Sequence, residues 1–367
     1  MAPRREDLAE RFGLHIADTD RFTVARRKRG DGWRFVDMRT GRSPGREIST
    51  TLKKLAIPPA WRDVRCADAL DAHILVVGTD GEGRRQYIYN PEWERVREAV
   101  KEHRLLQFGR VLPRIRAAVR RDLSAANRRT GNLRRRGVAA AVVRLLDRAG
   151  MRPGNEAYAL AGTRGASTLR KSDVAVDGPR VKLDYVGKHG REHEIELRDE
   201  PVARVLRRLK YGKRSARRDA RARNRKARER MFVYRGGDGR SYPLTAAKLN
   251  RYLVDAAGAP VSAKDFRTFI GSATALEALF EKRQEETERG RRKAVAEAVE
   301  ATSERLRNTP AVARSSYIMP TIIEAFERDE MPDTLFRGPT RNGLDRAETA
   351  LMRHLERFNS STETATQ

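Results

Sequence analysis

The chain has 367 residues, enough for two or three domains that each bury a core. Its 78 Lys and Arg outnumber 50 Asp and Glu, giving a formal net charge of +28. This excess favours a polyanionic partner, because each phosphate that the protein neutralises releases condensed counterions. No basic amphipathic anchor or long apolar run supports a membrane partner, and the single cysteine, Cys66, excludes an intrachain disulfide framework or a cysteine metal cluster.

The histidines and the first residues exclude two further classes. Among six histidines only His189 and His193 are close in sequence, and an even spacing within a strand pattern merely places them on one face, so we expect no metal site. Residues 1–7 are charged and lack the apolar core of a signal peptide, so a cytoplasmic protein is expected.

The first hundred residues show mostly strand patterns joined by glycine-rich turns. Residues 22–27 and 33–38 flank a Gly-Asp-Gly turn, which is typical of a β-hairpin. A second hairpin is predicted from 73–77, through a turn with three glycines, into 85–89. We therefore expect a small β-rich domain over residues 1–97.

Further along the chain, apolar residues recur every three or four positions, as on one face of a helix, and arginines cover the other faces. The repeating positions are Leu112, Ile115, Val119 and Leu123. Helical patterns continue over 139–146 and 244–326, and a final helix is predicted near 345–358. We expect a mainly α domain over 98–367, with a disordered Ser/Thr-rich tail at 359–367.

A single β-hairpin interrupts this helical domain. Apolar and polar residues alternate over 181–185 and again over 195–197, which indicates two half-buried strands. A turn bounded by glycines at 187–190 joins them and places Lys188 at the hairpin tip.

The stretch 210–230 consists almost entirely of Lys, Arg and Ala, opposed only by Asp219 and Glu229. A helix that contacts DNA is favoured here over the alternative of a solvated helix or flexible insert.

Breaking a phosphodiester without a metal ion requires a nucleophile, cations on the two non-bridging oxygens and an acid for the leaving oxygen. Arginine suits the oxygens, because its guanidinium donates two parallel hydrogen bonds and stays charged. Lysine suits the acid, because its pKa falls when it is desolvated beside other cations. A tyrosine nucleophile needs nearby positive charge, because its free pKa is about 10.

Four stretches of the second domain contain these residue types. Arg152 lies in Met-Arg-Pro-Gly-Asn-Glu, Lys188 in Val-Gly-Lys, Arg267 in Lys-Asp-Phe-Arg-Thr, and Tyr317 ends a run that begins at Asn308. Each alone has an ordinary interpretation: a surface arginine, a turn lysine, a helix salt-bridge partner, or one of nine tyrosines. Composition and spacing do not assemble them into one site.

Taken in order, the series Arg, Gly-Lys, Lys-Asp-Phe-Arg-Thr, Asn-Thr-Pro and Ser-Tyr strongly resembles the catalytic series of type IB DNA topoisomerases. Segments outside the series, at 57–61, 78–89 and 108–113, are similar to the bacterial, poxvirus-like branch of that family. The resemblance extends over about residues 45–330 and implies an isomerase that cuts one strand of duplex DNA.

By this resemblance, Tyr317 attacks the phosphate, forming a 3′-phosphotyrosyl link and a free 5′-hydroxyl. Arg152 and Arg267 hold the non-bridging oxygens, and Lys188, helped by Arg152, protonates the departing 5′-oxygen. Asn308 stands where several relatives carry histidine. Because asparagine cannot act as an acid, we expect it to donate a hydrogen bond to an oxygen.

In the first domain, Gln86, Tyr87 and Tyr89 resemble residues that contact or pack on the DNA from the opposite side. The alternative is a strand that buries its aromatic residues, because Tyr87 and Tyr89 share one face. Two features depart from the family pattern. Pro153 follows the first catalytic arginine, where relatives carry an aliphatic or aromatic residue, and the basic stretch 210–230 is longer than expected.

The implied fold is α+β, with a small β-rich N-terminal domain and a larger mainly α catalytic domain that carries a small β-hairpin sheet, forming a clamp around double-stranded DNA. The implied activity is relaxation of supercoiled DNA by a monomeric, nucleoid-associated enzyme without ATP, metal or other cofactor. The sequence contains no Gly-x-x-x-x-Gly-Lys-Ser/Thr phosphate loop, which fits ATP independence. Two alternatives remain: a site-specific tyrosine recombinase, against which the β-rich first domain argues, and a non-catalytic basic DNA-binding protein.

Overall fold

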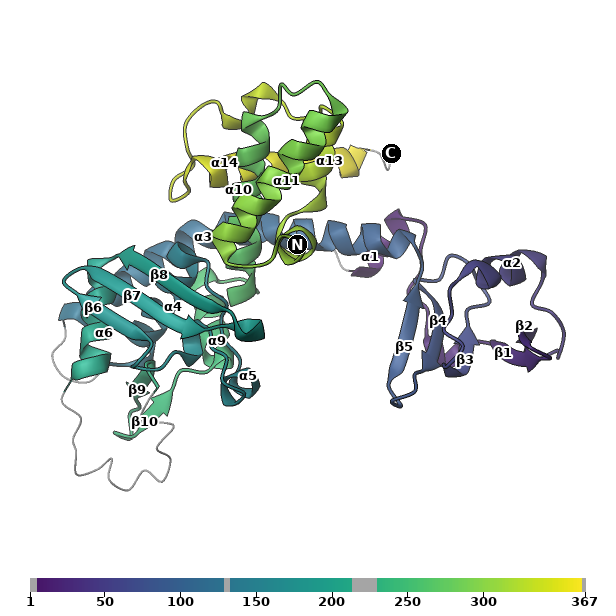
Figure 1. Ribbon diagram of the computed structural model, residues 1–367, viewed down its shortest axis with the longest axis horizontal. Coiled ribbons are helices and arrows are strands. Elements are labelled where there is room, and N and C mark those ends of the chain that lie inside the picture. Colours follow the sequence, from purple (N-terminus) through teal and green to yellow (C-terminus); the bar gives the residue numbers. More distant parts are fainter. Residues whose placement is uncertain (1–4, 129–132, 213–229, 365–367) are drawn as a thin grey trace. The chain divides into compact units, whose positions relative to one another are not determined.

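The computed structural model describes residues 5–128, 133–212 and 230–364. The chain divides into two compact units, the first made of Met1–Arg104 and Ser361–Gln367 and the second of Leu105–Ser360 (Figure 1). Most of the basic stretch at 210–230 lies outside the described residues, so its predicted contact with DNA stays a prediction. No helix in the described ranges is long and apolar enough to cross a membrane.

The first unit is built on an antiparallel sheet in the order β2-β1-β3-β4-β5. Its strands are β1 (Val24–Arg29), β2 (Gly32–Asp37), β3 (Arg62–Cys66), β4 (Ile74–Thr79) and β5 (Arg85–Tyr89). Both predicted hairpins are confirmed, since β1 pairs with β2 and β4 pairs with β5. The sequence patterns did not predict the helices α1 (Arg5–Arg11), α2 (Arg46–Lys54) and η1 (Thr19–Arg21).

Two buried side chains show how this small core is organised. Leu52 of α2 packs on one face of the sheet, and Cys66 of β3 is buried among the same apolar residues, which raises the pKa of its thiol to about 12. Arg26 of β1 is also buried, and its guanidinium donates to the carbonyl oxygens of Ile57, Pro58 and Trp61 at 3.3, 3.1 and 2.7 Å. The proline-containing segment that the family resemblance singled out is therefore tied to the sheet.

The second unit is mainly helical. Its helices are α3, which begins in the first unit (Glu92–Arg128), α4 (Arg135–Ala149), α5 (Glu156–Leu160), α6 (Glu200–Tyr211), α9 (Ala246–Ala257), α10 (Ala263–Glu281), α11 (Glu288–Leu306), α12 (Pro310–Tyr317), α13 (Pro320–Glu327) and α14 (Arg346–Thr364), with the short 3-10 turns η2 (Ala166–Thr168), η3 (Lys188–Gly190) and η4 (Asp333–Phe336). The predicted positions Leu112, Ile115, Val119 and Leu123 on α3 are all buried, as their spacing requires. Helix α14 continues to Thr364, so it is longer than predicted and includes part of the expected disordered tail.

The sheets of this unit correct the predicted single hairpin. The hairpin exists as β7 (Arg180–Val186) and β8 (Glu192–Arg198), but β6 (Val174–Asp177) pairs with β7 to make a three-stranded sheet. A separate ribbon is formed by β9 (Val233–Arg235) and β10 (Ser241–Pro243). These added strands have only three or four residues, too few for an alternating pattern to distinguish them from loop.

Helix α4 is the central element of the second unit. Nearly every side chain from Gly137 to Ala149 is buried, and the helix contacts α6, α9, α10 and β8. Because it is enclosed by these neighbours, the position of its C-terminal end is set by the whole core.

A buried ion cluster joins α14 to α3 and α4. The guanidinium of Arg116 is 2.7 Å from a carboxylate oxygen of Asp147 and 2.7 Å from one of Glu348, and it also donates to the carbonyl oxygen of Gly343 at 2.7 Å. Both carboxylates are nearly inaccessible to solvent, and within the described residues Arg116 is the cation paired with each of them.

Replacing Arg116 by alanine should lower the free energy of unfolding by about 3–5 kcal/mol, because two buried carboxylates lose their partner. Urea denaturation measures this change. Arg120→Ala, an exposed arginine one turn further along α3, is the matched control and should change stability by no more than about 0.5 kcal/mol. Equal losses in the two variants would contradict the role given to the cluster.

Candidate active site

The C-terminal end of α4 holds a cluster of arginine side chains. The helix ends at Gly150, whose φ of 60° lies in the left-handed region that glycine adopts without strain. The last carbonyl oxygens accept hydrogen bonds from three guanidinium groups: Arg305 to Arg148 at 3.1 Å, Arg307 to Ala149 at 3.0 Å, and Arg267 to Gly150. Because the C-terminal end of a helix carries partial negative charge, it offsets the mutual repulsion of these cations.

Arg267, on α10, is the most deeply buried of the three, with 2% of its surface exposed. Its Nη1 donates to the carbonyl oxygen of Gly150, and its Nη2 donates to that of Leu306 at 3.0 Å. Its Nε is buried and has no hydrogen-bond partner among the described residues. A buried donor without a partner costs about 1–3 kcal/mol, so this group favours an acceptor from outside the protein.

Tyr317 is the last residue of α12 and is fixed to α10 through its backbone. The hydroxyl of Ser272 donates to the carbonyl oxygen of Tyr317 and accepts from the amide of Met319, each at 3.2 Å. Gly271 permits this approach, because a Cβ at that position would lie 2.8 Å from the same carbonyl oxygen. The chain on both sides of the tyrosine is thus held in place.

The ring and hydroxyl of Tyr317 face the arginine cluster. The Cζ of Arg267 lies 4.6 Å from the centroid of the tyrosine ring. Burial alone would raise the pKa of Tyr317, but the charges and hydrogen bonds of Arg267 and then of Arg152 outweigh it, so its pKa lies below the usual value. The site therefore stabilises the phenolate, which is the nucleophilic form.

Arg152 and Asn308 complete this cluster. Arg152 follows α4 in a short loop, and its Nη2 donates to the Oδ1 of Asn308. Asn308 is buried, its backbone amide donates to Ser303 at 2.8 Å, and its Nδ2 has no partner among the described residues. The cluster thus contains a second buried donor that would be satisfied by an oxygen of a bound ligand.

The loop that carries Arg152 accommodates the unusual Pro153. The carbonyl oxygens of Arg152 and Pro153 accept from the amides of Ala166 and Ser167, both at 2.8 Å. These bonds use carbonyl oxygens, which proline retains, and not the N–H that proline lacks. Gly165 allows this packing, because a Cβ there would lie 2.7 Å from the carbonyl oxygen of Arg152.

Lys188 stands apart from the other four predicted residues. It occupies the tip of the β7–β8 hairpin, as predicted, and its side chain is exposed. Its Nζ lies 6.0 Å from the centroid of the Tyr158 ring, and no hydrogen bond joins it to the arginine cluster within the described residues. Arg152, Arg267, Asn308 and Tyr317 are therefore brought together, whereas Lys188 is presented on the hairpin tip.

Comparison with known proteins shows the family of this chain. Residues 91–330, well over half of the chain, match the family described as "Eukaryotic DNA topoisomerase I, catalytic core". Residues 32–80 match "Bacterial DNA topoisomerase IB, N-terminal domain". The chain belongs to the type IB DNA topoisomerases.

A similar protein carries the same family name. The DNA topoisomerase 1B of Acanthamoeba polyphaga mimivirus is 27% identical over 317 residues, which cover 83% of this chain and 88% of the relative. The resemblance found in the sequence is confirmed, and the topoisomerase is an isomerase whose substrate is DNA. Membership of this family also decides against the recombinase alternative.

Three residues of the site escaped the sequence reasoning. Tyr185, His193 and Arg307 line a small cavity together with Arg152 and Arg267. Burial, and then the charges of Arg152, Arg307 and Arg267, lower the pKa of His193 to about 4, so its ring is neutral at neutral pH. The strand periodicity indicated an inward position for two of them, because Tyr185 has the same parity on β7 as the buried Leu183, and His193 has the same parity on β8 as the buried Ile195.

In the first unit of the topoisomerase, the residues predicted to contact DNA lie on the edge strand β5. Tyr87 and Tyr89 are 38% and 44% exposed, and their ring centroids are 6.3 Å apart, so the alternative that the strand buries them is wrong. Gln86 points elsewhere, since its Nε2 donates to the carboxylate of Asp80 at 2.8 Å. The two rings remain available to a partner.

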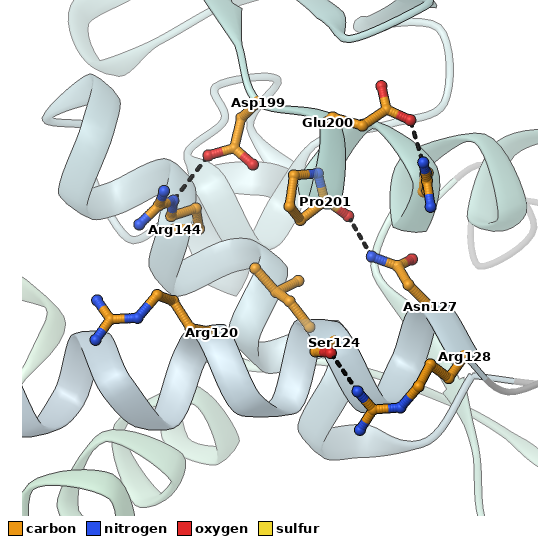
Figure 2. Close-up of a pocket in the computed structure, with 10 residues that line it drawn as sticks. Arg120, Ser124, Asn127, Arg128, Arg144, Asp199, Glu200 and Pro201 are labelled. Atoms are coloured by element: carbon orange, nitrogen blue, oxygen red, sulfur yellow. Dashed lines mark hydrogen bonds and ion pairs between the residues drawn. The ribbon is translucent and has the colours of Figure 1, made fainter.

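A larger cleft in the second unit, of about 470 Å³, lies between α3, α4 and the start of α6 (Figure 2). Its charged residues are mostly paired: Arg144 with Asp199 and Arg204 with Glu200, both at 2.7 Å. It contains none of the predicted catalytic residues and adjoins the end of β8 opposite the Lys188 turn. The volume of a cleft therefore does not identify the candidate active site in this protein. No group of three or more potential metal ligands occurs in the described ranges.

Removing the Arg267 charge should raise the pKa of Tyr317, because the largest influence that lowers it is lost while burial remains. We expect Arg267→Gln to move the phenol titration upward in NMR spectra of ring-labelled tyrosine, with Tyr317→Phe identifying the signal. Arg305→Gln is the matched control, because Arg305 also caps α4 but does not influence Tyr317, and it should leave the titration unchanged. An unshifted signal in Arg267→Gln would refute this electrostatic account.

Proposed function

We propose that this topoisomerase relaxes supercoiled DNA by cutting one strand through a 3′-phosphotyrosyl intermediate and then resealing it, without ATP or a metal ion. The observation that supports this most directly is the convergence of Arg152 and Arg267 on the hydroxyl of Tyr317, which lowers its pKa. A tyrosine whose phenolate is stabilised beside two guanidinium groups suits attack on a phosphodiester.

In the proposed reaction the Tyr317 oxygen forms a bond to phosphorus as the bond from phosphorus to the 5′-oxygen breaks, and the phenolic proton passes to water. The unpartnered Nε of Arg267 and Nδ2 of Asn308 donate to non-bridging oxygens, and Arg152 adds a further positive charge. One phosphoester bond replaces another of similar energy. The released 5′-hydroxyl can therefore reverse the reaction with no input from ATP.

Lys188 is proposed to protonate the departing 5′-oxygen. It is the predicted residue that the free protein does not hold beside Tyr317, so the hairpin tip would meet the DNA backbone only in the complex. Catalytic contacts are often longer or poorly aligned before substrate binds, and exposure at a hairpin tip is compatible with this role.

The two predicted domains, 1–97 and 98–367, are proposed to bind opposite sides of the duplex as a clamp, in a monomeric enzyme associated with the nucleoid. The exposed rings of Tyr87 and Tyr89 support a contact from the first domain, because aromatic side chains pack well on sugars and bases. The strongly positive net charge supports binding to the phosphate backbone.

Tyr317→Phe should bind DNA with unchanged affinity but form no covalent adduct and relax no plasmid, because only the attacking oxygen is missing. Tyr242→Phe is the control. It removes a surface hydroxyl that donates to Asp238 at 2.6 Å, and it should form the adduct normally. A plasmid relaxation assay in EDTA and a denaturing gel give both readouts. Relaxation by Tyr317→Phe would disprove the nucleophile, and a wild-type protein that binds DNA without any adduct would favour the non-catalytic alternative.

Lys188→Ala should slow strand cleavage by about 10²–10⁴-fold on ordinary DNA, because an alkoxide is a poor leaving group without an acid. Most of the rate should return when sulfur replaces the bridging 5′-oxygen, because a thiol has a pKa of only about 8.5 and its thiolate departs unprotonated. Arg267→Ala should recover little, since charge on the non-bridging oxygens is unaffected by the sulfur. Equal recovery of both variants, or of neither, would count against this division of roles.

A further inference from the structure

The imidazole of His193 lies directly beneath the turn that carries Lys188. If Gly187 had a Cβ, that atom would lie 2.3 Å from both the Cδ2 and the Nε2 of His193. Gly187 has a φ of −92°, which any residue can adopt, so the close approach of the ring is the reason for glycine at this position. The turn is closed by the amide of Gly187, which donates to the carbonyl oxygen of Arg191 at 2.7 Å.

The other side of the imidazole borders the arginine cluster. His193 is 6% exposed and lines the cavity shared by Arg152, Arg267 and Arg307. Its cross-strand partner Tyr185 packs beside it, with ring centroids 5.1 Å apart. A neutral ring can fill this position beside three guanidinium groups, whereas a positively charged side chain would be repelled.

The side chain of Lys188 has few contacts that could fix its direction. It is exposed, and its one contact among the described residues is with the ring of Tyr158 at 6.0 Å. The direction of its side chain therefore depends on the backbone of the turn, and that backbone packs at Gly187 against the ring of His193.

We propose that His193 is a positioning residue for the acid step: its ring sets the Gly187–Lys188 turn against the arginine cluster, so that the Lys188 ammonium meets the 5′-oxygen. The lysine then transfers one proton to that oxygen as the bond to phosphorus breaks, and becomes a neutral amine. His193 neither gives nor takes a proton. This inference rests on the proposed role of Lys188.

His193→Ala should slow cleavage of ordinary DNA by about 10–100-fold, because small misplacements of a catalytic group carry costs of this size. Sulfur in place of the bridging 5′-oxygen should restore most of the rate, as for Lys188→Ala. Gly187→Ala should behave in the same way, because its new methyl group pushes the ring and the turn apart. This variant keeps the test open if His193→Ala folds poorly.

Two comparisons separate positioning from a general loss of structure. The double variant His193→Ala/Lys188→Ala should be no slower than Lys188→Ala alone, since both changes act on one step. His354→Ala is the matched control, because His354 is also buried with a pKa lowered to about 4 but lies on α14, and its cleavage rates on both substrates should equal those of wild type.

The outcomes are distinguishable. Slow cleavage of both substrates by His193→Ala and Gly187→Ala, or additive losses in the double variant, would overturn the positioning role while Lys188 keeps its own. If Lys188→Ala is not rescued by sulfur, the acid assignment fails and this inference fails with it.

Discussion

The capped C-terminal end of α4 is the constraint on which the candidate active site depends. A guanidinium group is difficult to bury, and several together repel one another, yet the buried Arg267, the half-buried Arg307 and the exposed Arg305 converge at this point. The free carbonyl oxygens of the helix make this arrangement possible, because they accept hydrogen bonds and carry partial negative charge. Because α4 is enclosed by the core of the second unit, its carbonyl oxygens hold the arginine side chains in fixed positions.

This constraint divides the site into a fixed part and an exposed part. Tyr317, Arg267 and Asn308 are held by backbone hydrogen bonds and burial, which suits groups that must stabilise charge without rearrangement. Lys188 projects from a hairpin into solvent. In the proposed mechanism the lysine would therefore meet the 5′-oxygen only when the DNA backbone is in place.

Local sequence patterns predicted the elements better than their assembly. The two hairpins of the first unit, the buried face of α3 and the position of Lys188 follow from short-range spacing. The contact of Arg152 with Asn308 joins residues 156 positions apart, and no local period carries such information. Only the family resemblance placed the two residues in one site, and it did not predict the contact itself. The very short strands β6, β9 and β10 were missed for a related reason, since their pairing rather than their own sequence defines them.

The solvent exposure of Tyr87 and Tyr89 also lay beyond the sequence, because a shared face does not reveal which side of the sheet is covered. His193 shows the opposite case. Its strand parity indicated an inward position, but only the packing showed that its neighbours are the Gly187 turn and three arginines.

The two unpartnered donors, Arg267 Nε and Asn308 Nδ2, imply that the empty enzyme is less stable than its fold allows. An apolar side chain of similar volume at position 267 would remove the cost of the unpartnered Nε, but it would also remove the positive charge that the proposed reaction uses. Under the proposed reaction, selection for thermal stability alone would therefore favour replacements that lower activity. In the proposed reaction the DNA supplies the oxygens that these donors lack, so binding of DNA would also stabilise the protein.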